Sequence, residues 1–145
     1  MQRFYTQPFS FTTLVKGDEH PKCNLQQSIA LRIHLILITS FNEFRYDPEF
    51  GCLIWDCDFE NIPNVTAWKD RMSKAIKLVV EKFELRLRNH QVTVEITEEE
   101  FIQNNQTLLK KVKRRVDVIV KGNLKTTNEQ FHFKEIMYIS PVWVD

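Results

Sequence analysis

The side chains best suited to chemistry in this sequence are carboxylates gathered between residues 41 and 63. They are Glu43, Asp47, Glu49, Asp56, Asp58 and Glu60. Glycoside hydrolysis uses two carboxyl groups about 5–10 Å apart, one of which an apolar environment keeps protonated. Aromatic residues lie between these acids, but nothing in the sequence marks one carboxylate as the proton donor. A peptidoglycan-degrading, lysozyme-like hydrolase that uses the acidic loop 43–60 is therefore the alternative function, and we assign no catalytic residue.

A second group with chemical potential consists of His20, Cys23, Cys52 and Cys57. Three thiolates and one imidazole are a known zinc ligand set, although these spacings resemble a zinc finger only loosely. Three reduced thiols and a loop histidine explain the same residues, so we expect neither a metal nor another cofactor. Phosphate-cradling and nucleophile-elbow glycine motifs do not occur in a chain with three glycines.

Glu84 and Arg86 form the remaining pair of interest, at the end of an apolar–polar periodic segment. A surface ion pair is worth about 0–1 kcal/mol and is the more common situation, so the sequence alone favours a solvated pair. The other interpretation is a partly buried pair that fixes how a helix enters a strand or meets a charged partner. Arginine suits that role because its planar guanidinium binds a carboxylate at two points.

Composition and length limit the classes of protein to be considered. The 145 residues fit one domain, 1–145, and the formal net charge of +1 gives no reason to expect nucleic-acid binding. The most apolar segment, 29–38, is too short and too polar to span a bilayer, so we expect no membrane insertion. Without an apolar leader the cytoplasm is the expected location.

Two segments have helical periodicity. Between residues 65 and 86 the apolar residues fall on one face, and Asn64 is a suitable N-terminal cap. A second helix is predicted over residues 25–40, capped by Asn24 and apolar almost all round, which indicates a helix between other elements. His34 within it is expected to be a half-buried residue with a partner rather than a ligand.

Alternating residues predict strands near 92–96, 112–123 and 130–139, the last ended by Pro141. Thr97 and Glu100 have capping-box spacing, so we expect a helix to begin near Glu98. The N-terminal segment alternates aromatic and polar residues and is expected to be a short strand or extended arm. The predicted fold is α+β, with two main helices on one face of a small antiparallel sheet and a C-terminal β-hairpin.

The order of the motifs resembles a known family. Helix 25–40 is followed by Glu43-Phe44-Arg45, the block 48–52 (PEFGC), an amphipathic helix, Glu84-Leu85-Arg86 and a V-x-V-x-I strand. This order is similar to that of the phage baseplate-wedge (GPW) family, and within it to the TssE group of bacterial type VI secretion systems, in its Bacteroidetes form. Two departures stand out: Leu85 replaces the proline of a Glu-Pro-Arg signature, and Asn42 replaces a glycine.

The resemblance implies a structural baseplate subunit without enzymatic activity, located in the cytoplasm in a baseplate docked at the inner membrane. Its implied partners are contractile sheath subunits and wedge subunits, with no small-molecule substrate. An exposed strand edge could accept sheath strands through main-chain hydrogen bonds, and we expect the hairpin 116–139 to provide that edge. The residues assigned to partner binding or to the structural motif are Glu84, Arg86, Glu43, Arg45, Val116, Val118, Val120, Phe131 and Phe133.

Overall fold

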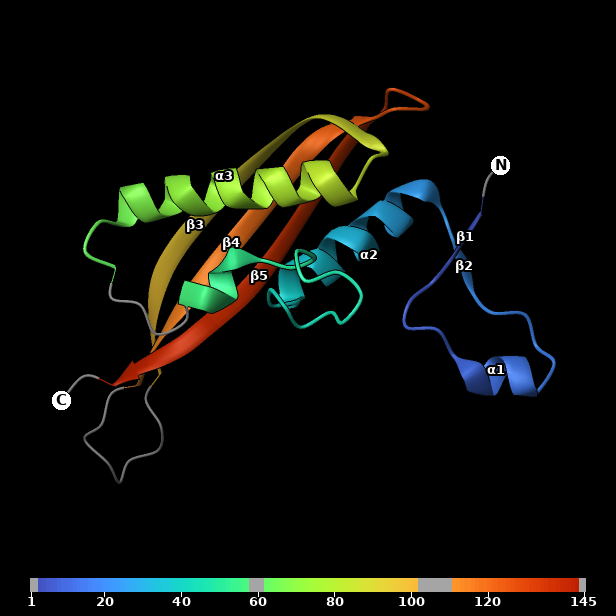
Figure 1. Ribbon diagram of the computed structural model, residues 1–145, viewed down its shortest axis with the longest axis horizontal. Helices are drawn as coiled ribbons and strands as arrows, with labels where there is room; N and C mark the ends of the chain where they lie inside the picture. Colours follow the sequence, from blue (N-terminus) through green and yellow to red (C-terminus); the bar gives the residue numbers. More distant parts are fainter. Residues whose placement is uncertain (1–2, 58–61, 102–110, 144–145) are drawn as a thin grey trace.

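The computed structural model describes residues 3–57, 62–101 and 111–143. Its elements, in chain order, are β1 (Phe4–Tyr5), α1 (Phe11–Val15), β2 (Lys22–Cys23), α2 (Leu25–Ile38), the 3-10 helix η1 (Leu53–Cys57), α3 (Val65–Phe83), β3 (Leu87–Phe101), β4 (Lys111–Leu124) and β5 (Gln130–Trp143). The three long strands form an antiparallel sheet in the order β3–β4–β5, and β1 pairs with β2 separately. Figure 1 shows α3 running along the long sheet, with α2 nearer to β5. The fold is α+β, as predicted.

Helix α3 has the amphipathic form that its periodicity predicts. Asn64 caps it, its side chain accepting a hydrogen bond of 3.0 Å from the backbone N–H of Ala67. The buried residues of the helix are Trp68, Met72, Ile76 and Val80. Each such side chain contributes about 1.5–3 kcal/mol when it leaves water, so this face holds the helix to the sheet.

Helix α2 completes the same core from the side of β5. Asn24 and Gln27 form a reciprocal capping box at its start. The core cluster joins Ile29, Ile33 and Leu37 of α2 to the buried side chains of α3 and of all three long strands. Both main helices therefore cover one face of the sheet, as expected.

The predicted helix near Glu98 is wrong, because β3 continues as a strand to Phe101. In the strand, Glu98 lies opposite Arg114 and Glu99 opposite Lys113. A helix would have placed like charges in one turn, whereas the strand sets Glu98 and Glu99 against basic residues of β4. Opposite charges in register stabilise strand pairs. Residues 102–110 lie outside the described residues.

The prediction that Pro141 ends the last strand is also wrong. Strand β5 continues to Trp143, with a register irregularity between Ile139 and Val142. Proline lacks a backbone N–H and is tolerated in edge strands and at bulges, and β5 is an edge strand.

The N-terminal segment matches its expectation only in part. A two-residue strand is present, β1, but the alternating residues that follow it form the short helix α1. That helix buries none of its residues; Phe11 and Val15 remain 74% and 87% exposed. Phe9 stacks on the ring of His20, with 4.4 Å between centroids, and remains partly exposed.

The segment after α2 is a closed loop packed by its own side chains. Its ends meet where the N–H of Cys52 donates to the carbonyl of Thr39 at 2.8 Å. Asn42 has φ of +65°, a left-handed conformation that glycine adopts freely and that asparagine tolerates better than most other residues. Gly51 has φ of +156°, and a Cβ there would lie 2.8 Å from the carbonyl carbon of Ser40, so only glycine fits.

Candidate functional site

The candidate site begins where α3 ends and β3 begins. Helix α3 stops at Phe83, and Glu84 caps it with its N–H donating to the carbonyl of Val80 at 2.8 Å. A turn at Leu85 and Arg86 then leads into β3. The turn forms with Leu85 in the place of proline, and Leu85 is 66% exposed.

Arg86 holds the carboxylate of Glu84 at two points. Its Nε donates to Oε1 at 2.7 Å and its Nη2 donates to Oε2 at 2.6 Å. The Glu84 side chain is only 1% exposed, while that of Arg86 is 33% exposed. The expectation of a solvated surface pair is therefore wrong for Glu84, whose charge lies inside the protein. A buried carboxylate is tolerated when it is paired and hydrogen-bonded, as this one is.

Arg86 connects three further parts of the chain, two through its guanidinium and one through its main-chain carbonyl. Nη1 of Arg86 donates to Oγ of Ser28 in α2 at 2.9 Å, and the guanidinium carbon lies 5.5 Å from the centroid of the Phe4 ring in β1. The carbonyl of Arg86 accepts a hydrogen bond of 2.9 Å from the N–H of Lys125 in the β4–β5 turn. The Glu84–Arg86 junction thus fixes α2, α3, β1 and the hairpin relative to one another.

The hairpin residues assigned to partner binding do not share one location. Val116, Val118 and Val120 lie on the central strand β4, fully buried against the helices. Phe131 is buried as well, and Phe133 is half-buried against the core. Their side chains form the core of the free protein, so any direct part of the hairpin in binding falls to the outer edge of β5. That the nine assigned residues meet partners stays a prediction.

The outer edge of β5 is open in the described part of the chain. Strand β5 pairs with β4 alone, and no other described strand lies along its second edge. An edge strand presents unpaired N–H and C=O groups along that side. The main-chain chemistry needed for strand addition is therefore present.

Glu43 and Arg45 lie in the closed loop after α2. The Glu43 carboxylate accepts a hydrogen bond of 2.7 Å from the N–H of Ser40, and Glu43 donates its own N–H to the carbonyl of Ser40 at 3.2 Å. Arg45 is exposed. Glu43 therefore has a local structural role.

Among the other described carboxylates of the loop, Asp56 is exposed, and Asp47 and Glu49 make contacts with their surroundings. Asp47 accepts from the N–H of Glu49 at 3.1 Å, and Glu49 pairs with Lys82 of α3. Asp58 and Glu60 lie outside the described residues. Glu43 and Asp47 both line a pocket beside Phe44 and Phe50. Each carboxylate accepts a hydrogen bond from a backbone N–H of the loop.

The residues considered for zinc are engaged in other contacts. Nε2 of His20 lies 2.8 Å from the carbonyl oxygen of Thr6, and its Nδ1 accepts from the N–H of Ser10 at 3.4 Å. Burial raises the pKa of the Cys52 thiol to about 12, which keeps it protonated. Within residues 3–57, 62–101 and 111–143, no group of three or more His, Cys, Asp or Glu side chains could hold a metal ion.

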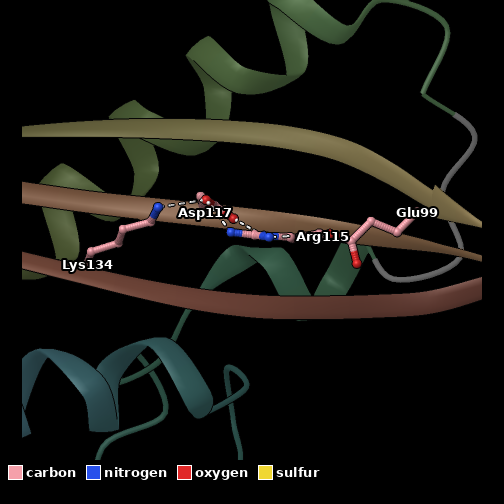
Figure 2. A network of polar contacts seen from close by, with 4 residues as sticks. All are labelled: Glu99, Arg115, Asp117 and Lys134. Carbon is pink, nitrogen blue, oxygen red and sulfur yellow. Dashed lines mark hydrogen bonds and ion pairs between the residues drawn. The ribbon is translucent and has the colours of Figure 1, made fainter.

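The sequence analysis missed a charged network on the sheet face that the helices leave open (Figure 2). Arg115 donates from Nε to Oδ1 of Asp117 at 2.7 Å and from Nη2 to Oδ2 at 3.1 Å. Arg115 also contacts Glu99 at 3.3 Å, and Lys134 of β5 lies 3.0 Å from Asp117. The Arg115 hydrogen bonds lower the pKa of Asp117, and Asp117 in turn raises the pKa of Arg115. The signal in the sequence was a pair of charge blocks of opposite sign, the glutamates at 98–100 and the basic run at 110–115. Their pairing across β3 and β4 becomes visible only once the register is known.

Comparisons with known proteins give the class and then the family. The model of the family "Baseplate wedge protein gp25" matches residues 23–129, which is well over half of the chain, so the chain belongs to the gp25 baseplate-wedge family. Proteins of this family are generally structural. The match includes the Glu84–Arg86 junction and all of β4. The predicted membership of the phage baseplate-wedge family is confirmed.

A solved structure supports the same fold. A protein from Geobacter sulfurreducens, provisionally described as a tail lysozyme, superposes with a TM-score of 0.56 at 22% sequence identity, covering 81% of this chain and 94% of that one. No curated protein sequence matches the chain. No helix in the described residues is long and apolar enough to cross a membrane.

Proposed function

We propose that this protein is a structural baseplate subunit of a contractile type VI secretion apparatus, of the TssE type. It templates the first ring of the sheath by strand addition and bridges to wedge subunits. The baseplate in which it works is docked at the inner membrane, on the cytoplasmic side. The observation that supports this best is the open edge of β5 in a chain of the baseplate-wedge family.

Strand addition supplies affinity through main-chain hydrogen bonds, so it makes few demands on side chains. Strand β5 has 14 residues, well above the usual five or six, and offers a long template. The buried valines of the neighbouring strand β4 hold the sheet against the helices. The Glu84–Arg86 junction sets the angle at which the template leaves the helical body.

The direct test is co-purification of the tagged full chain with sheath and wedge subunits from its own host. We expect both to be retained, and retention of neither would contradict the proposal.

Hydrogen–deuterium exchange tests whether the outer edge of β5 is the site of strand addition. On sheath binding, alternate amides between residues 131 and 139 should become protected, because in an edge strand every second N–H points away from its neighbour. Protection confined to β3 would contradict the assignment of β5.

We also propose that the protein acts without catalysis. The description of the Geobacter protein as a tail lysozyme keeps the hydrolase alternative open to test. A turbidity assay on purified peptidoglycan decides between them, with Glu43→Gln and Glu49→Gln as controls. No clearing is expected from the native chain; clearing that either substitution abolishes would establish the hydrolase.

A further inference from the structure

A groove lies beside the open edge of β5, between that strand, α2 and the β1–β2 pair. Its volume is about 500 Å³. Part of its lining is apolar, from Cys23, Ala30, Leu31 and Phe133, and Glu135 contributes its one carboxylate. Any strand that pairs with β5 over residues 133–135 would place side chains in this groove.

Glu135 is unusual because it points toward the helices from an edge strand. It lies opposite Val118, which is fully buried, on the same face of β5 as Phe133 and Met137. Its side chain remains 22% exposed, and Oε2 lies 3.0 Å from Nδ1 of His34 in α2. An inward-pointing charge is one of the devices by which edge strands avoid pairing with copies of themselves.

The Glu135 carboxylate also favours particular side chains on a strand that is added to β5. Oε1 of Glu135 has no hydrogen-bond partner among the described residues, so it retains capacity to accept one. The nearby cation Lys22 is already paired with Glu19 at 3.2 Å. An incoming side chain beside Glu135 would therefore meet an acceptor and a negative charge, and opposite charges on adjacent strands are favourable.

We infer that the β5 edge, in the strand addition proposed above, accepts an extended protein segment of a particular pattern. In that segment a basic residue and an apolar residue are separated by one polar residue. The basic residue lies beside Glu135 and the apolar residue beside Phe133. The spacing of two follows from the pleat, because only alternate residues of the added strand face the groove. Glu135 sets the partner's charge, and the main chain supplies the remaining attraction.

The test uses synthetic peptides and the ¹⁵N-labelled full chain. The first peptide is Ac-Thr-Val-Thr-Lys-Thr-Val-Thr-amide, whose symmetric order fits β5 in either direction; the others replace its lysine by glutamine or glutamate. Amide shifts of residues 131–139 report binding at millimolar peptide. The lysine peptide should bind about two- to fivefold more tightly than the glutamine peptide, and the glutamate peptide most weakly.

Two variants of the chain distinguish the charge preference due to Glu135 from strand addition itself. Glu135→Gln should abolish the preference among the peptides. His34→Gln, the matched control on the same groove, should keep it, because the carboxylate remains. Dispersed amide spectra confirm that each variant is folded.

The outcomes are distinct. Equal shifts of the β5 amides by all three peptides would overturn selection by Glu135 and leave strand addition intact. A lysine preference that survives in Glu135→Gln would also overturn it. No shift at β5 with any peptide would contradict both this inference and the use of this edge in the proposed function.

Discussion

The Glu84–Arg86 and Arg115–Asp117 pairs have the same i, i+2 spacing and the same two-point contact between guanidinium and carboxylate. The arginines are almost equally exposed, at 33% and 30%. The carboxylates differ: Glu84 is 1% exposed and Asp117 17%. Asp117 also has Lys134 as a second cation, whereas Arg86 is the single cation in contact with Glu84 among the described residues. The same pair geometry thus forms a buried contact at the Glu84–Arg86 junction and part of a surface network with a second cation at Asp117.

The largest effect is expected from Arg86→Gln. This change leaves the buried Glu84 carboxylate without its cation, which should cost about 3–5 kcal/mol of the free energy of unfolding. Urea denaturation measures the loss. The double variant Glu84→Gln/Arg86→Gln should be clearly more stable than Arg86→Gln alone, because it removes the uncompensated charge. A loss below about 1 kcal/mol in the single variant would end the distinction between the two pairs.

A smaller effect at the same joint is expected from Ser28→Ala. The change removes the hydroxyl that accepts from Nη1 of Arg86 and should cost about 1–2 kcal/mol. Ser73→Ala on α3 is the matched control: it should be neutral or slightly stabilising, because alanine is the better helix former. Equal changes in the free energy of unfolding for Ser28→Ala and Ser73→Ala would mean that the Arg86–Ser28 contact contributes nothing to stability.

The Arg115–Asp117 pair should make the stability of the protein depend on pH. The pKa of Asp117 is lowered from 3.8 in the folded protein, so its stabilising contribution is present above that value and is lost as pH falls through the lower folded value. Asp117→Asn should therefore be less stable than the native chain at pH 7. The gap in thermal midpoint should close in acid, once the native Asp117 is itself protonated. A gap independent of pH would show that its charge plays no part.

The smallest effect is expected from Arg115→Gln, because Lys134 still pairs with Asp117. The thermal midpoint should fall by about 2 °C or less at low salt. This difference should vanish in 1 M NaCl, where the screening length is about 3 Å, while the loss in Arg86→Gln should persist. An equally persistent loss in both variants would remove the contrast.

Local patterns in the sequence were sufficient to predict the two main helices and most of the sheet. Asn24 and Asn64 mark the starts of α2 and α3 because capping depends on neighbours three residues away. Asn42 and Gly51 likewise identify turns through their own backbone preferences. The length of β3 was misjudged, since the capping-box spacing at Thr97 competes with cross-strand charge pairing, which the sequence does not reveal without the register.

The candidate site was harder to predict because, like the pairing of charges across β3 and β4, it depends on residues that are distant in the sequence. The surroundings of the Glu84–Arg86 pair include Ser28 and Phe4, which contact Arg86 and lie more than fifty residues earlier in the chain. The contact of Glu135 with His34 likewise joins residues that lie about one hundred positions apart in the sequence. The residue types at the junction were visible as a motif, but their surroundings come only from the tertiary fold.

The lengths of the elements have a mechanical consequence. Strands β4 and β5 have 14 residues each, or about 45–50 Å of extended chain, while the 19 residues of α3 extend about 28 Å. The sheet therefore outreaches its longest helix by about 20 Å. A small tilt of the helical body is magnified at the strand tips. In the strand addition proposed above, the contacts of Arg86 would therefore limit how accurately the far end of β5 is positioned.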